Sequence, residues 1–142
     1  MTAISMTVGN VRPLMNCRTE RAIVNEAMTV GMAVYIDGST GDLPTIKKSV
    51  LTAVATGNVW GVVVSGPVAR PGVTTLAAGD VVDVAVAGRV EGFSGATAGG
   101  IAYASDTAGG IADAAGTKVC VVGVMVTPTV LFVRPMLAAV SA

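Results

Sequence analysis

The chain has 142 residues, which is enough for one domain with a single hydrophobic core. Its nine basic and nine acidic residues cancel, so net charge does not attract it to nucleic acid or to an anionic membrane, and we expect neither partner. Histidine is absent, which removes the most common general base and the most common metal ligand.

Apolar residues make up 52% of the chain, and Val and Ala dominate them. Because Val prefers pleated strands and Gly supplies turns with positive φ, this mixture predicts short strands joined by tight turns. The uncharged stretch 49–69 contains Asn58, Pro67 and several Gly, which fits two strands and a turn better than a membrane-spanning helix. Residues 1–13 lack the basic and continuous apolar regions of a signal peptide.

Residues 1–19 show no strand pattern, since Asn10, Pro13 and Asn16 interrupt it. Basic residues cluster where this segment ends, at Arg12, Arg18 and Arg21. Two interpretations remain open: an extended arm that orders against a partner protein, or an edge strand with a frayed terminus. In either case we expect a single β domain over residues 20–142.

An internal repeat is the most informative feature of the sequence. Thr29–Tyr35 and Thr97–Tyr103 share the pattern T-x-G-x-x-x-Y at an offset of 68 residues. Each copy predicts a strand followed by a hairpin, with polar tips at Asp37–Asp42 and Ser105–Gly110.

The repeat continues downstream at a shorter offset. Trp60–Pro67 resembles Val122–Pro128 at an offset of 62, so the first copy carries about six additional residues. We place these residues around Ile46–Val50 and, because Lys47 and Lys48 lie there, predict an exposed loop. The repeat-like halves then span about 20–67 and 88–135.

The segments outside the repeat complete the predicted fold. Val81–Val90 alternates as a half-buried strand does, and Thr129–Arg134 is the expected last strand. Only Leu51–Val59 has a doubtful helical pattern. The sequence therefore predicts an all-β single domain, a barrel or sandwich of about eight to ten short strands with an internal duplication.

We find no residue pattern that indicates catalysis. Ser94 lies in a Gly-rich turn but has no histidine to activate it, and the run 95–100 lacks the Lys of a phosphate loop. Lys47 and Lys48 lack the flanking residues of a biotinyl or lipoyl attachment site. We therefore expect no enzyme and no catalytic or cofactor-binding residues.

Metal binding and redox chemistry are also not indicated. Asp37 and Asp42 are interpreted as turn-capping residues, because the oxygen-rich order of a calcium loop is missing. Asp80 and Asp83 should face opposite sides of a strand. Cys17 and Cys120, far apart in sequence, fit two separate thiols in a reduced protein better than a disulfide, which stays open.

Four segments together resemble a known family. They are ATAGGIAYASDTAGGI (96–111), VVGVMVTPTVLFVRP (121–135), EAMTVGMAVYIDGSTGDL (26–43) and WGVVVSGPV (60–68). Their turn and strand phrases resemble those of the capsid decoration, or cement, proteins of tailed bacteriophages. The resemblance covers about residues 20–135 and contains no catalytic signature.

This resemblance implies a small β-tulip-like fold on the outer surface of the virion, made in the host cytoplasm. Such proteins bind the major capsid protein and stabilise the expanded capsid, and they assemble with themselves, usually as homotrimers and in some cases as dimers. The candidate residues for contact with capsid or with another subunit are Arg12, Arg18, Arg21, Trp60 and Arg70. The alternatives are another virion β domain, in a tail tube or baseplate, and a small ligand-binding β-barrel module.

Overall fold

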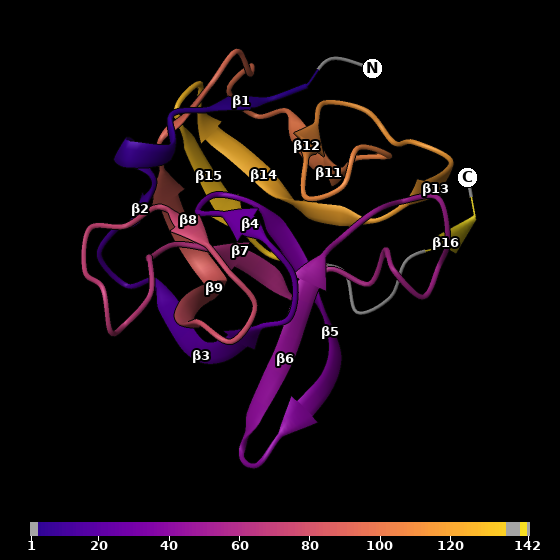
Figure 1. The fold of residues 1–142 in the computed structure, drawn as a ribbon. Coiled ribbons are helices and arrows are strands. Elements are labelled where there is room, and N and C mark those ends of the chain that lie inside the picture. Colours follow the sequence, from indigo (N-terminus) through magenta and orange to yellow (C-terminus); the bar gives the residue numbers. More distant parts are fainter. Residues whose placement is uncertain (1–2, 136–139, 142) are drawn as a thin grey trace.

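The structure is a computed structural model that describes residues 3–135 and 140–141, and its described part is all-β (Figure 1). Eight strands have three or more residues: β3 (Arg18–Val24), β5 (Ala33–Thr40), β6 (Leu43–Lys48), β7 (Gly61–Val63), β9 (Val81–Glu91), β11 (Ile101–Ala104), β14 (Val121–Thr127) and β15 (Val130–Val133). Eight more have two residues: β1 (Ser5–Met6), β2 (Arg12–Pro13), β4 (Met28–Thr29), β8 (Thr75–Leu76), β10 (Phe93–Ser94), β12 (Ile111–Ala112), β13 (Lys118–Val119) and β16 (Val140–Ser141).

The remaining elements are short, which agrees with the prediction of a β protein. A single 3-10 turn, η1 (Val8–Asn10), follows β1. The doubtful segment Leu51–Val59 forms turns instead of a helix. Among the described residues, no helix has the length and apolar character that a membrane crossing requires.

The first half of the molecule is a ring of five paired strands. β9 pairs with β3, β3 with β6, β6 with β5, β5 with β7, and β7 pairs back to β9. Only the β3–β6 pair is parallel. The ring encloses small and β-branched side chains that are fully buried, a choice that suits a narrow interior. They are Ala22, Val24, Val34, Ile46, Val63, Val82 and Val84.

The second half repeats this order. β12 pairs with β11, β11 with β14, β14 with β15, and β15 with the second part of β9. In this half the row of described strands from β12 to β9 does not close on itself, and the N-terminal segment lies in the gap between its two ends. Ile4 donates its N–H to the carbonyl of Ile111, and β1 pairs with β10, which continues β9. Residues 3–6 are therefore the strand that completes the second ring.

The strand register confirms the duplication predicted from the sequence. Val34 pairs with Gly61 in the first half as Ala102 pairs with Gly123 in the second. A side chain at either glycine would collide with the carbonyl oxygen of the neighbouring strand, at Ala85 or at Phe132. The two halves thus share their strand order, their register and the reason for a glycine at this position.

The prediction for the additional residues of the first copy is wrong. Ile46–Lys48 belong to β6, and both Ile46 and Ser49 are buried. Nine residues lie between the paired Ile36 and Ile46, whereas six lie between Ala104 and Ile111, so part of the insertion lengthens the hairpin. The rest lies in the loop 49–60. The side chains of Lys47 and Lys48 form ion pairs with acidic residues next to β6. Two adjacent lysines are therefore compatible with a strand at this place.

The hairpin tips are predicted correctly in place but not in extent. The second tip spans Ser105–Gly110, as expected. In the first, Asp37–Thr40 continue β5, and the turn is confined to Gly41 and Asp42. The longer β5–β6 hairpin consequently extends away from the body of the molecule (Figure 1).

β9 joins the two halves because each of its ends belongs to a different ring. Residues 81–87 pair with β3 and residues 88–91 with β15. The change occurs at Gly88, whose φ of 108° is unfavourable for other residues. A Cβ atom at Gly88 would lie 2.6 Å from the Cα atom of Cys17, so the position also lacks space.

We expect Gly88→Ala to destabilise the protein more than Gly79→Ala. Gly79 has a similar φ of 97° but open space around its Cα atom. The loss of stability in Gly79→Ala therefore measures the backbone strain alone, about 1–2 kcal/mol. The collision with Cys17 should add roughly 2 kcal/mol or more at Gly88. Urea unfolding of both variants measures the difference, and equal losses would contradict the role given to the contact with Cys17.

Candidate protein-binding site

Four of the five residues predicted to contact capsid or another subunit form ion pairs within the chain, and three of these pairs lie along β9 or in the turn before it. Arg12 pairs with Glu91 across β2 and β9, and Arg21 lies 3.6 Å from Asp83 across β3 and β9. Arg70 binds Asp80 at 2.7 Å in the turn before β9. A carboxylate of a partner protein would compete with these carboxylates. Exposed pairs of this kind contribute at most about 1 kcal/mol each, so the competition is feasible.

The fourth ion-paired residue, Arg18, and the fifth predicted residue, Trp60, lie in the same groove. The groove has a volume of about 470 Å³ and lies over β3, β5 and β9. Trp60 precedes β7, is partly buried, and donates its backbone N–H to the carbonyl of Val34. The lining residues are Arg18, Glu20, Ile36, Asn58, Val59, Trp60, Val86, Ala87 and Pro135.

The groove combines an apolar base with a charged rim. Ile36 is 45% exposed although it is a large apolar residue on a strand. Arg18 and Glu20 form an ion pair of 3.3 Å, and the Arg18 side chain is 73% exposed. Trp and Arg are the residues most enriched where protein interfaces are strongest. This composition is typical of a protein-binding groove.

The protruding hairpin borders the groove through Ile36. β5 pairs with β7 only at Ala33 and Val34, so in the described part of the chain residues 37–40 have no strand on that edge. Unpaired strand edges are places where another chain can add a strand. Gly41 and Asp42 at the tip are exposed and reach farthest from the body.

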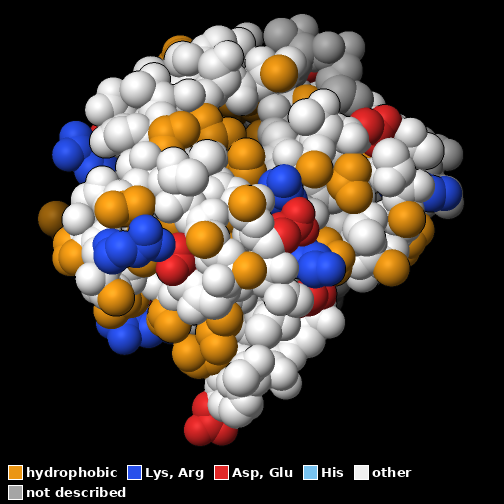
Figure 2. Space-filling view, viewed as in Figure 1, with side chains coloured by type: hydrophobic (Ala, Val, Ile, Leu, Met, Phe, Trp, Pro, Cys, Tyr) orange, Lys and Arg blue, Asp and Glu red, His pale blue; other side chains and the backbone are white. Residues whose placement is uncertain are grey.

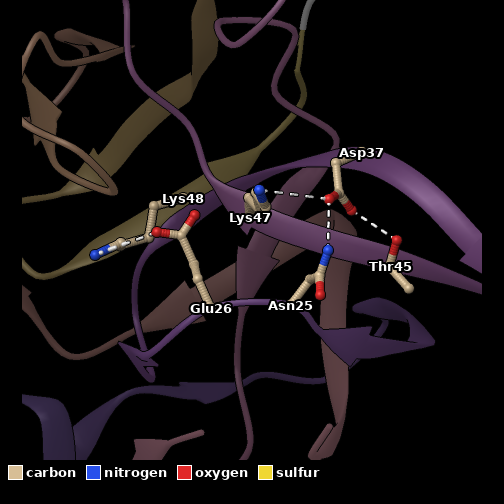
Figure 3. Close-up of polar contacts among 6 residues, drawn as sticks. All are labelled: Asn25, Glu26, Asp37, Thr45, Lys47 and Lys48. Atoms are coloured by element: carbon tan, nitrogen blue, oxygen red, sulfur yellow. Dashed lines mark hydrogen bonds and ion pairs between the residues drawn. The ribbon is translucent and has the colours of Figure 1, made fainter. Parts of the chain in front are cut away.

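A polar cluster fixes the root of this hairpin (Figure 3). The register of β5 and β6 shifts between Ile36 and Gly38, so Asp37 is a bulge residue without a direct partner strand residue. Its carboxylate accepts hydrogen bonds from Thr45 Oγ1 at 2.6 Å and Asn25 Nδ2 at 2.8 Å. Lys47 Nζ lies 4.0 Å away. The bulge thus aims the carboxylate at three donors.

The donors determine the ionisation of Asp37. Partial desolvation by itself would raise the pKa of the carboxyl, but the hydrogen bonds from Thr45 and Asn25 and the charge of Lys47 outweigh it. The pKa of Asp37 is therefore lowered, and the ionised form holds the hairpin. Lys48 adds a second tie, 3.5 Å from Glu26, on the strand that follows the bulge.

Asp80 and Asp83 interact with different partners. Asp80 accepts a hydrogen bond from the N–H of Ala77 and pairs with Arg70, whereas Asp83 interacts with Ser65 and Arg21. Across the described residues, no group of three or more Cys, Asp or Glu could hold a metal ion. Cys17 and Cys120 are free thiols, and burial raises the pKa of both.

Charged side chains of both signs are interspersed with apolar ones on the face that Figure 2 shows. The formal net charge is zero, and no large region of one sign is visible on this face. Recognition at this surface therefore depends on shape and local apolar contact more than on long-range electrostatic attraction.

Sequence reasoning missed most of the groove. Ile36, Val59 and Pro135 come from three distant segments, and each is ordinary in its own segment. The bulge that directs Asp37 was also missed, because Asp37 and Gly38 have the composition of a turn. A signal was available in the additional residues of the first repeat, since a longer hairpin must extend past the equivalent one.

Comparison of the chain with protein-family models gives no match, and comparison with curated proteins gives none either.

We expect Asp37→Asn to destabilise the hairpin at neutral pH. Because the folded-state pKa is lowered, the ionised carboxylate contributes stability above the usual Asp pKa of about 3.9, and this contribution is lost as the pH falls through the lowered value. The stability difference between wild type and variant should therefore shrink in acid. Denaturant unfolding between neutral and acidic pH measures it.

Asp42→Asn is the matched control, since Asp42 lies on the same hairpin at the exposed tip. It should change stability little at either pH. A difference between wild type and Asp37→Asn that stays constant down to pH values well below 3.9 would contradict the role of the ionised carboxylate.

Proposed function

We propose that this chain is a structural virion protein that binds the outside of a tailed-phage head and holds neighbouring major capsid proteins together. The proposal combines the resemblance of residues 20–135 to capsid decoration proteins with the groove that contains Trp60 and Arg18. The groove is the observation that carries it, because Arg18 and Trp60, both expected from the sequence to contact capsid or another subunit, lie in one partly apolar site.

The groove suits a protein partner with a short apolar segment. Trp60, Ile36 and Val59 offer apolar surface, and the Arg18–Glu20 pair at the rim can exchange partners with charges on another protein. The neighbouring edge of β5 offers backbone groups that an extended segment can pair with. One segment could thus combine backbone pairing with an apolar anchor.

Modest contacts are sufficient for this function. A capsid presents many copies of the same site, and a decoration protein that touches two capsid subunits gains avidity without a strong individual contact. The protruding hairpin gives the chain a second contact region away from its body, and the Asp37 cluster keeps that region rigid. Rigidity limits the entropy lost on binding.

The sequence suggested an N-terminal arm that orders against a partner protein. In this proposal the N-terminal segment does not make the capsid contact. Residues 3–13 already pair with β9, β10 and β12 of the same chain, and Arg12 is paired with Glu91. Addition of this segment to a strand of capsid protein would require loss of those pairings. The groove and hairpin need no such rearrangement, so we assign the capsid contact to them.

We expect Ile36→Glu to weaken binding to expanded heads at least about tenfold, the effect of losing roughly 1.4 kcal/mol from an apolar anchor. Val68→Glu is the matched control because Val68 is 44% exposed, against 45% for Ile36, and lies outside the groove. Cosedimentation with undecorated expanded heads of the phage that encodes the chain gives both affinities. Equal binding by the two variants would exclude the groove as the contact.

A reconstruction of the phage particle tests the location separately. We expect density for this chain outside the capsid lattice, at symmetry positions between major capsid proteins. Density in the tail tube or baseplate would replace the decoration role with that of another virion β domain. A particle without the chain would favour the small ligand-binding module, for which the groove would be the site.

A further inference from the structure

We propose that residues 3–6 are an exchangeable strand, and that a second copy of this chain can receive the strand in the slot between β10 and β12. The inference does not depend on the capsid role, because it concerns only how one copy of the chain contacts another. It rests on the way in which the second ring is completed.

The slot recognises an extended segment through both of its edges. On one side Ser5 pairs with Ser94 and Met6 with Phe93. On the other side Ala3 forms a bridge to Ala112, and Ile4 N–H donates to the carbonyl of Ile111 at 2.9 Å. The strand thus bridges two elements that are not paired with each other among the described residues.

Side chains of the strand alternate between the interior and solvent. Ile4 is only 4% exposed and belongs to the hydrophobic core, whereas Ser5 is exposed. The Met6 sulfur packs against Gly31, in space that the side chain of a larger residue at position 31 would occupy. Ile4 is therefore the main anchor, and Met6 ties the strand to the first half.

The first half needs no such strand. Its ring is completed by the direct parallel pairing of Ile23 with Thr45 and Val24 with Ile46. In the second half the equivalent strands stand apart, and a segment from outside the repeat occupies the space between them. The slot is thus a binding site for a separate strand, and in this structure its occupant comes from the same chain.

The link between residues 3–6 and β2 is a short connection, residues 7–11. It contains the turn η1, in which no residue is buried. The link contacts Gly92, which lies between β9 and β10, because Thr7 donates its N–H to the carbonyl of Gly92 at 2.8 Å and a Cβ atom at Gly92 would lie 2.7 Å from the Cα atom of Val11. A strand from a second copy would make the same pairings with β10 and β12 that the chain's own strand makes, which is the condition for domain swapping.

A disulfide trap tests this exchange. Cα atoms of paired residues in antiparallel strands are about 4.5–5.5 Å apart, inside the range of about 4.4–6.8 Å that a disulfide spans. One copy carries Ser5→Cys and the other Ser94→Cys, both at exposed positions. Both also carry Cys17→Ser, whereas Cys120 is retained because it is fully buried.

The control mixture pairs the Ser5→Cys copy with a Ser39→Cys copy, since Ser39 is equally exposed but lies on the distant hairpin. The copies are mixed as folded proteins at high concentration, and in a second arm they are refolded together. We expect several-fold more covalent heterodimer with Ser94→Cys than with Ser39→Cys, and a 5–94 disulfide by mass spectrometry. Yields equal to the control in both arms would overturn the proposal.

Discussion

The central constraint in this molecule is that one strand, β9, belongs to two rings. Its eleven residues supply one wall of the first ring and, after Gly88, one wall of the second. Neither ring can form its hydrogen bonds without β9, so the two repeats fold as one unit with one continuous core. Where β9 passes from one ring to the other, the backbone of Gly88 has a φ of 108°, a conformation that glycine adopts readily.

The narrow rings explain the amino-acid composition. The buried side chains are mainly Val, Ala and Ile, and Phe93 is the aromatic residue among the buried hydrophobic residues of the described chain. The buried positions alternate along β15 and over the last three residues of β3, as they do in half-buried strands generally. The high fraction of apolar residues therefore reflects two small interiors with a large combined surface. The all-β class could be predicted from the sequence for the same reason.

The repeat was predictable because it depends on local features. The pattern T-x-G-x-x-x-Y places a turn and a strand in the same order twice, and Gly61 and Gly123 meet the same close approach to a neighbouring strand. Local composition failed where contacts from distant segments decide the structure. Lys47 and Lys48 suggested a loop, but the alternation that buries Ile46 and directs the lysines to Asp37 and Glu26 makes a strand.

The N-terminal segment illustrates the same limit in a different way. Nothing in residues 1–19 indicates that Ile4 fills a core position, because the slot that receives it is formed by residues about 90 to 110 positions away. Sequence reasoning could therefore only pose the choice between an arm and an edge strand. The segment shares properties with both, because it is extended and it pairs with strands of the domain.

These features favour a protein that works through repeated modest contacts. Ion pairs in the described part of the chain involve at least six of its nine basic residues, and such pairs contribute little energy each. In the proposed function, affinity would therefore come from the groove, the hairpin and the strand that we propose to be exchangeable. Strand exchange adds no new surface, because the contacts within one chain and between two chains are the same. The free-energy difference between the two arrangements is then small, and local concentration decides between them. A surface that holds many copies side by side, as a capsid does, would supply that concentration.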